Sequence, residues 1–167
     1  MSQSAAKVQA TQQVSGLEFA TCSHVGLKRN INQDSFAMRL ADSPAAFQSK
    51  GHLFVVADGM GAHAAGELAS RLAVDEVETA EVGESYAKSL IAHFQRANTI
   101  IHEQGQANPQ LYNMGTTCSA LWLLPTGAMI GHVGDSRVYR LRGDRLEQLT
   151  FDHSLVWEMQ AAGQYSA

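Results

Sequence analysis

Three aspartates in this sequence stand at expected strand ends or turns, where a carboxylate can reach a ligand. They are Asp34 in NQDSF, Asp58 in VVADGMG and Asp135 in HVGDSRVY. Carboxylate oxygens, backbone carbonyls and retained waters are the ligands that Mg²⁺ and Mn²⁺ prefer. Gly59 follows Asp58 and lacks a Cβ, so its carbonyl can turn toward a cation. The pattern therefore indicates a site for hard divalent cations.

Arg29 adds a group that is suited to phosphate. It lies five positions before Asp34, and a guanidinium matches two oxygens of a phosphate. An arginine beside bound cations favours hydrolysis of a phosphoester by metal-activated water. Simpler explanations exist for each residue taken alone: an aspartate can cap a turn, an arginine can lie on a solvated face, and His63 can be an ordinary residue at a helix start. The occurrence of these residues together and in this order favours a cation and phosphate site over the simpler explanations.

Strands and helices grouped apart along the chain must position these residues. Apolar periodicity predicts strands over 17–25, 34–40, 52–58, 116–124, 128–134 and 136–142. It predicts helices over 65–77 and 86–101, and a short helix from Ser154. Turn-forming residues predict loops over 41–51 and 105–113 and a turn at 142–145. This grouping predicts a mixed antiparallel architecture rather than a doubly wound parallel sheet. The almost continuous apolar run HLFVVAD predicts a strand buried on both faces. The turn GMGAHA has Ala64 where a dinucleotide fingerprint needs glycine, which excludes that site.

Composition limits the remaining classes of function. The chain has 167 residues, enough for one domain, and 12 basic against 16 acidic residues give a net charge of −4. That balance argues against partners such as nucleic acid or an anionic membrane. Residues 1–15 are polar and aperiodic and predict a disordered tail before one domain over 16–167. An N-terminus without an apolar core predicts a cytoplasmic protein.

The two cysteines are isolated, which argues against a zinc site or a disulfide framework. Their strand-like surroundings predict that both Cys22 and Cys118 are buried as small apolar residues. A cysteine-based phosphatase would need a cysteine and an arginine six positions apart. Cys22 and Arg29 are seven apart, so the spacing argues against that mechanism, which activity insensitive to a chelator would revive.

Five segments in order resemble the successive motifs of bacterial PPM-type (type 2C) metal-dependent Ser/Thr protein phosphatases. They are VGLKRNINQDSF, LFVVADGMGAHAAGELAS, MGTTCSALWL, GHVGDSRVYRLR and QLTFDHSLV. The resemblance covers about residues 16–163. It implies an α+β fold in which a β-sandwich of antiparallel sheets is flanked by helices on both faces. It also implies two bridging Mn²⁺ or Mg²⁺ ions, with a third in a looser site, and direct attack of water on phosphorus.

The resemblance assigns roles to single residues. Asp58 would bridge both metals, the Gly59 carbonyl would complete one, and Asp34 would bind a metal directly or through its water shell. Asp135 would serve the third site, Arg29 would hold the substrate phosphate, and His63 would help to protonate the leaving group. The implied substrate is a phosphorylated protein, in a signalling role that counteracts a Ser/Thr kinase.

The sequence also departs from the family pattern. Gln33 stands where the family usually has glutamate, and Ala62 replaces a common glycine of the turn. The Ser-Asp-Gly and Asp-Asn motifs, which supply two further metal ligands, do not occur, and Asp144 and Asp152 are poor substitutes for them. We interpret the chain as a C-terminally truncated phosphatase with an incomplete fold, in which metal binding and turnover are impaired. The alternative is an inactive remnant that binds phosphoproteins through Arg29 and the acidic site.

Overall fold

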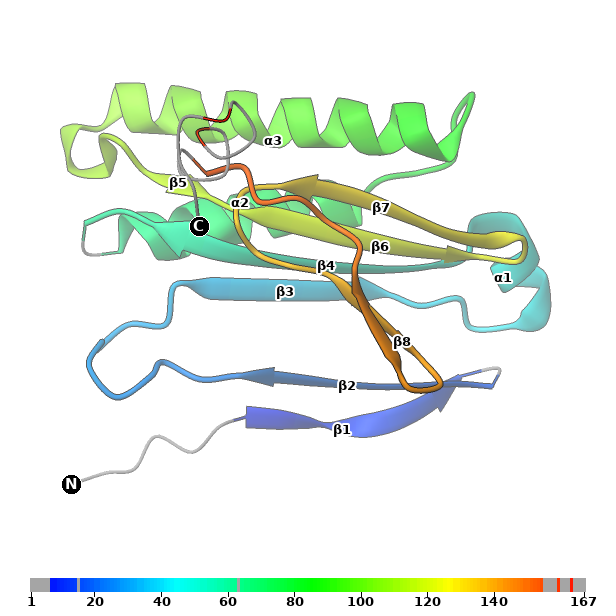
Figure 1. Ribbon diagram of the computed structural model, residues 1–167. Helices are drawn as coiled ribbons and strands as arrows, with labels where there is room; N and C mark the ends of the chain where they lie inside the picture. Colours follow the sequence, from blue (N-terminus) through cyan, green and yellow to red (C-terminus); the bar gives the residue numbers. More distant parts are fainter. Residues whose placement is uncertain (1–6, 15, 63, 155–158, 160–162, 164–167) are drawn as a thin grey trace.

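The computed structural model describes residues 7–14, 16–62, 64–154, 159 and 163, as Figure 1 shows. A central antiparallel sheet has the strand order β3-β4-β6-β7, with β5 paired to β4. Its strands are β3 (Asp34–Arg39), β4 (His52–Met60), β5 (Gly115–Thr116), β6 (Cys118–Leu124) and β7 (Gly127–Val133). Two further sheets have two strands each: β1 (Lys7–Val14) with β2 (Leu17–Ser23), and β8 (Tyr139–Arg142) with β9 (Arg145–Gln148). The predicted mixed antiparallel architecture is confirmed.

One face of the central sheet is covered by two long helices, α2 (Ala65–Glu78) and α3 (Tyr86–Ala107). Small and β-branched residues of α2, such as Ala69, Ala73 and Val77, are buried against this face. Leu53 and Trp122 are opposite each other on β4 and β6, and both are fully buried. The helical spacing of apolar residues thus places the main core between the helices and the sheet.

The other face of the central sheet meets strands. Phe19 of β2 packs edge-to-face on Phe54 of β4, with the ring centroids 5.7 Å apart. A cleft of about 480 Å³ lies between β2, this face of the sheet and the segment that leads into β8. Within the described residues the long helices lie on the opposite face, and the short helix α1 (Pro44–Lys50) contacts this one at its end, where Phe47 stacks on His52. The full helical layer that we predicted on this face is not seen in that part of the chain. Val56 of β4 is 52% exposed, so the prediction that its strand is buried on both faces is wrong at this position.

Four further predictions need correction. Residues 7–14, predicted to be disordered, form β1, because backbone pairing with β2 does not depend on apolar side chains. The predicted loop over 41–51 contains helix α1 (Pro44–Lys50), which begins where the Ser43 side chain accepts a hydrogen bond from the Ala46 N–H. Helix α3 extends to Ala107, and the short 3₁₀ helix η1 (Pro109–Leu111) follows it. Cys22 is exposed rather than buried.

Cys118 is buried as predicted, and burial raises the pKa of its thiol to about 12. The turn after β8 contains Asp144, also as predicted. The short helix predicted from Ser154 falls almost wholly outside the described residues. In the part of the chain that the structure describes, no helix has the length and apolar character needed to cross a membrane.

Candidate active site

Asp34 and Asp58 lie side by side at one end of the central sheet. They are direct cross-strand partners at the start of β3 and near the end of β4. Directly opposed residues of an antiparallel pair carry Cβ atoms about 5 Å apart on the same face of the sheet. The register of β3 on β4 therefore brings together two carboxylates that are 24 positions apart in the sequence.

The pair of carboxylates has the electrostatics of a cation site. Partial burial, and after it the charge and the hydrogen bond of Asp58, raise the pKa of the Asp34 carboxyl above its ordinary value, although Arg29 opposes this rise. Two carboxylates this close repel each other unless a proton or a cation lies between them. Oxygen donors in such a pair fit Mg²⁺ or Mn²⁺. Asp34 and Asp58 are therefore residues that could hold a divalent cation.

Arg29 lies in the loop before β3 and reaches toward the same end of the sheet. Its Nη1 donates to Gln33 Oε1 at 3.4 Å. The Gln33 Nε2 in turn donates to the Gly61 carbonyl at 3.2 Å. A glutamate could not make this second hydrogen bond, because an ionised carboxylate has no N–H or O–H to donate. The departure from the family pattern at Gln33 thus gives a neutral link between Arg29 and the turn after β4.

The glycine-rich turn after β4 is held close to the start of α2. The Gly59 N–H donates to the Gln33 carbonyl at 3.0 Å. A Cβ on Gly59 would lie 1.9 Å from the Gly66 carbonyl oxygen, so only glycine fits. Ala62 does not have a positive φ, and its replacement of glycine is therefore tolerated as predicted. His63 lies outside the described residues.

Asp135 lies in the connection from β7 to β8. Its neighbour Gly134 has a φ of +105°, a conformation that favours glycine. The His153 N–H donates to the Gly134 carbonyl at 2.8 Å, and the Gly134 N–H donates to His153 Nδ1 at 3.3 Å. These hydrogen bonds fix the backbone that carries Asp135.

Asp152 binds Arg137 rather than joining the acidic site. Arg137 Nε and Nη2 donate to the two carboxylate oxygens, with the shortest contact at 2.6 Å. This contact lowers the pKa of the Asp152 carboxyl below its ordinary value. The carboxylate of Asp152 is therefore held in an ion pair with Arg137, which is consistent with its prediction as a poor metal ligand.

Two threonines to which the sequence assigns no role of their own contact the backbone of Asp58. The Asp58 N–H donates to Thr117 Oγ1 at 3.0 Å, and the Asp58 carbonyl accepts from the Thr117 N–H at 2.9 Å. Thr116 Oγ1 also donates to the Asp58 carbonyl at 3.0 Å. The consecutive threonines in MGTT were the available signal, but their partners depend on the pairing of β4 with β5 and β6.

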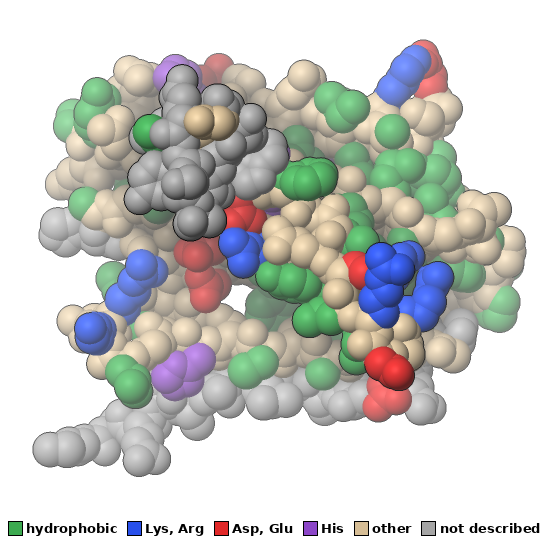
Figure 2. All heavy atoms as spheres, viewed as in Figure 1, with side chains coloured by type: hydrophobic (Ala, Val, Ile, Leu, Met, Phe, Trp, Pro, Cys, Tyr) green, Lys and Arg blue, Asp and Glu red, His purple; other side chains and the backbone are tan. Residues whose placement is uncertain are grey.

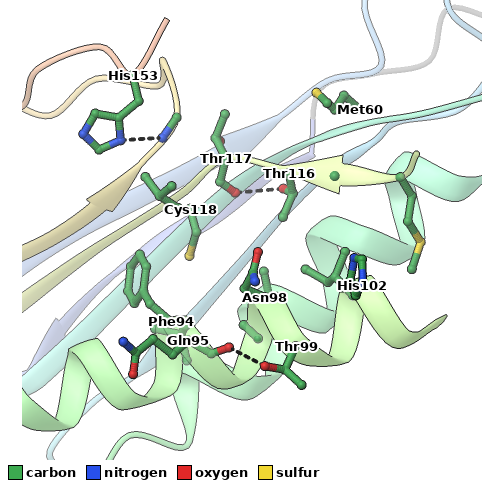
Figure 3. Close-up of a pocket in the computed structure, with 18 of the residues that line it drawn as sticks. Met60, Phe94, Gln95, Asn98, Thr99, His102, Thr116, Thr117, Cys118 and His153 are labelled. Carbon is green, nitrogen blue, oxygen red and sulfur yellow. Dashed lines mark hydrogen bonds between the residues drawn. The ribbon is translucent and has the colours of Figure 1, made fainter. Parts of the chain in front are cut away.

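A pocket of about 830 Å³ lies next to these threonines, between the strands and α3. Figure 3 shows Thr116, Thr117 and His153 on one side of it and Phe94 and Asn98 of α3 on the other. Asp135 also lines the pocket.

Figure 2 shows acidic side chains gathered on one face of the molecule, with Lys or Arg side chains on both sides of them. Within the described residues, no group of three or more His, Cys, Asp or Glu side chains could hold a metal ion. The structure thus brings Asp34 and Asp58 together with Arg29 nearby, and places Asp135 outside this pair.

Comparison with known proteins identifies the family. The family model for protein phosphatase 2C matches residues 23–162. The chain belongs to the protein phosphatase 2C family. Protein phosphatase PhpP of Streptococcus pneumoniae is 35% identical to it over 154 residues, which cover 89% of this chain and 60% of PhpP. Serine/threonine protein phosphatase PstP of Mycobacterium tuberculosis is 36% identical over 143 residues, which cover 84% of this chain and 26% of PstP.

Solved structures of protein phosphatase 2C relatives share the fold. Serine/threonine phosphatase Stp1 from Staphylococcus aureus superimposes with a TM-score of 0.73 at 30% identity, over 86% of this chain and 57% of that one. The catalytic domain of PstP in complex with two manganese ions gives a TM-score of 0.69 at 34% identity, over 86% and 59% of the two chains. This protein phosphatase 2C chain therefore spans about 60% of the length of the phosphatase domains that it matches.

Proposed function

We propose that this chain belongs to an enzyme that hydrolyses phosphoserine and phosphothreonine in proteins with the help of Mn²⁺ or Mg²⁺. The observation that carries the proposal is the Asp34–Asp58 pair, which lies beside Arg29 in a chain of the protein phosphatase 2C family. The activity of the phosphatases PhpP and PstP supports the substrate class. A phosphorylated protein that is the product of a Ser/Thr kinase is the proposed partner.

The residues of the chain have distinct roles in this proposal. Asp34, Asp58 and the Gly59 carbonyl would hold two cations, and Asp135 would serve a third, looser site. When bound, the cations supply a water of lowered pKa and neutralise charge on the phosphoryl oxygens. Arg29 binds and orients the phosphate through its guanidinium.

Two further parts of the proposal concern the leaving group and the compartment. His63 would donate a proton to the leaving serine or threonine oxygen, as the resemblance implies. Free thiols at Cys22 and Cys118 support a reducing compartment, and we propose the cytoplasm.

The test is hydrolysis of p-nitrophenyl phosphate and of a phosphothreonine peptide by the 167-residue chain, with Mn²⁺ and with a chelator. We expect slow, chelator-sensitive turnover that Asp58→Ala abolishes. The matched control is Asp144→Ala, which removes the same group from the exposed turn between β8 and β9. Turnover by Asp58→Ala at the wild-type rate would contradict the metal assignment.

The same assay separates the enzyme from a phosphoprotein-binding remnant. Binding of the peptide that Arg29→Ala abolishes, without any turnover of substrate, would favour the remnant. Turnover that persists in the chelator would contradict both and point to metal-independent chemistry.

A further inference from the structure

We infer that Thr117 is a positioning residue that holds Asp58 and the Asp135 loop in a fixed relation to each other. Its hydroxyl contacts both segments: Thr117 Oγ1 accepts from the Asp58 N–H at 3.0 Å and lies 2.7 Å from Ser136 Oγ. The side chain of Thr117, which lies between β5 and β6, thus links Asp58 of β4 with the connection from β7 to β8 that carries Asp135. The inference rests on the proposed function in that it takes both aspartates to be cation ligands.

The backbone pairing at Thr117 departs from a regular ladder. The Thr117 N–H donates to the Asp58 carbonyl, as in an ordinary hydrogen-bonded antiparallel pair. The reciprocal bond does not go to the Thr117 carbonyl, because the Asp58 N–H donates to the Thr117 hydroxyl instead. The Thr117 carbonyl accepts from Thr116 Oγ1 at 2.8 Å, the contact drawn in Figure 3. The backbone position of Asp58 therefore depends on a side-chain hydroxyl.

The methyl group of Thr117 makes the second part of the link. A Cβ on Gly134 would lie 2.6 Å from Thr117 Cγ2 and 2.7 Å from Thr117 Cβ. Gly134 thus packs directly on Thr117, and its φ of +105° sets the direction of the chain into Asp135. The hydroxyl and the methyl group of one threonine contact the residues on both sides of Asp135, namely Gly134 and Ser136.

The test compares Thr117→Val, which keeps the shape and loses the hydroxyl, with Thr117→Ser, which keeps the hydroxyl. Amide hydrogen exchange by NMR should show that the Asp58 N–H exchanges about tenfold faster in Thr117→Val, since a hydrogen bond of ordinary strength is lost. Thr117→Ser should restore slow exchange. Ser136→Ala should leave the exchange of Asp58 unchanged and shift the resonances of Asp135.

Mn²⁺ affinity, measured by electron paramagnetic resonance of the free ion, is the second readout. We expect about tenfold weaker binding in Thr117→Val, with recovery in Thr117→Ser. The matched control is Thr99→Val on α3, where the hydroxyl donates to the Gln95 carbonyl of its own helix at 3.1 Å. It should bind Mn²⁺ like the wild-type chain.

The outcomes separate this inference from the proposed function. If the wild-type chain binds Mn²⁺ and Thr117→Val matches it in both affinity and exchange, the inference is overturned and the proposed function stands. If the wild-type chain binds no Mn²⁺, the proposed function fails together with the metal part of the inference. Faster exchange at Asp58 in Thr117→Val would then still establish the structural link.

Discussion

Replacing Gly59 by alanine tests how tightly the end of β4 is packed against the start of α2. The new Cβ would lie 1.9 Å from the Gly66 carbonyl oxygen and 2.8 Å from the Gln33 carbonyl oxygen. The first distance is roughly 1.5 Å short of ordinary contact, and both oxygens belong to backbone that cannot rotate away. Overpacking of this kind costs about 1–3 kcal/mol, and loss of the Gly59–Gln33 hydrogen bond adds about 1 kcal/mol. We therefore expect Gly59→Ala to lower the free energy of unfolding by about 2–4 kcal/mol.

Urea denaturation followed by circular dichroism measures this change. The matched control is Gly83→Ala, because a Cβ at Gly83 meets nothing within 4 Å and its φ is not positive. The control should change the free energy of unfolding by less than about 1 kcal/mol. If Gly59→Ala unfolds within about 0.5 kcal/mol of the wild-type chain, the close approach of β4 to α2 is refuted.

Two further predictions concern groups away from the acidic pair. Burial lowers the pKa of His52, whose Nδ1 accepts a hydrogen bond from the Ala41 N–H at 2.9 Å. The unfolded chain therefore binds more protons than the folded chain, and the free energy of unfolding should fall as the pH drops below about 6.5. His52→Asn keeps a hydrogen-bond acceptor that does not titrate, so its free energy of unfolding, measured by urea denaturation, should fall less than that of the wild-type chain between about pH 7 and about pH 5. An equal fall in the two chains would contradict the role assigned to His52. A thiol reagent should modify exposed Cys22 rapidly and buried Cys118 only on unfolding, and Cys22→Ser should remove the rapid phase. Rapid modification that persists in Cys22→Ser would show that Cys118 is accessible.

The periodicity of apolar residues predicted the elements that build the core. Helix α2 and the greater part of α3 follow from the spacing of residues such as Ala69, Ala73 and Leu90, and the apolar run before Asp58 correctly predicts β4. Periodicity could not show that Val56 is exposed while Phe54, on the same side of β4, packs on Phe19. That depends on which elements cover the second face of the sheet, and this information is not local.

Two segments were predicted wrongly for reasons of local chemistry. The polar sequence of β1 has little apolar pattern, and its pairing with β2 is made by backbone groups that every residue carries. In the segment over 41–51, the Ser43 cap and the proline at the first helical position are start signals for α1. Their weight was underestimated because the segment also carries the residues that are typical of turns.

The aspartates that the structure pairs could be picked out from the sequence, whereas the contacts that hold them in place could not. Asp58 was recognisable at the end of an apolar run, and its partner Asp34 from the order of motifs. The contacts of Gln33 with Gly61 and of Thr117 with Ser136 join segments that are 28 and 19 positions apart. Such contacts depend on strand register and turn geometry, which the spacing of single residue types does not specify.

Binding of Mn²⁺ to the 167-residue chain is the measurement that tests the central claim most directly. Titration followed by electron paramagnetic resonance should show weak binding that both Asp34→Asn and Asp58→Asn reduce by about tenfold or more, since each removes one charged oxygen ligand. Asp144→Asn should bind Mn²⁺ like the wild-type chain, because it carries the same substitution in the exposed turn after β8. Equal Mn²⁺ affinity in the wild-type, Asp34→Asn and Asp58→Asn chains would contradict the assignment of this carboxylate pair as a cation site.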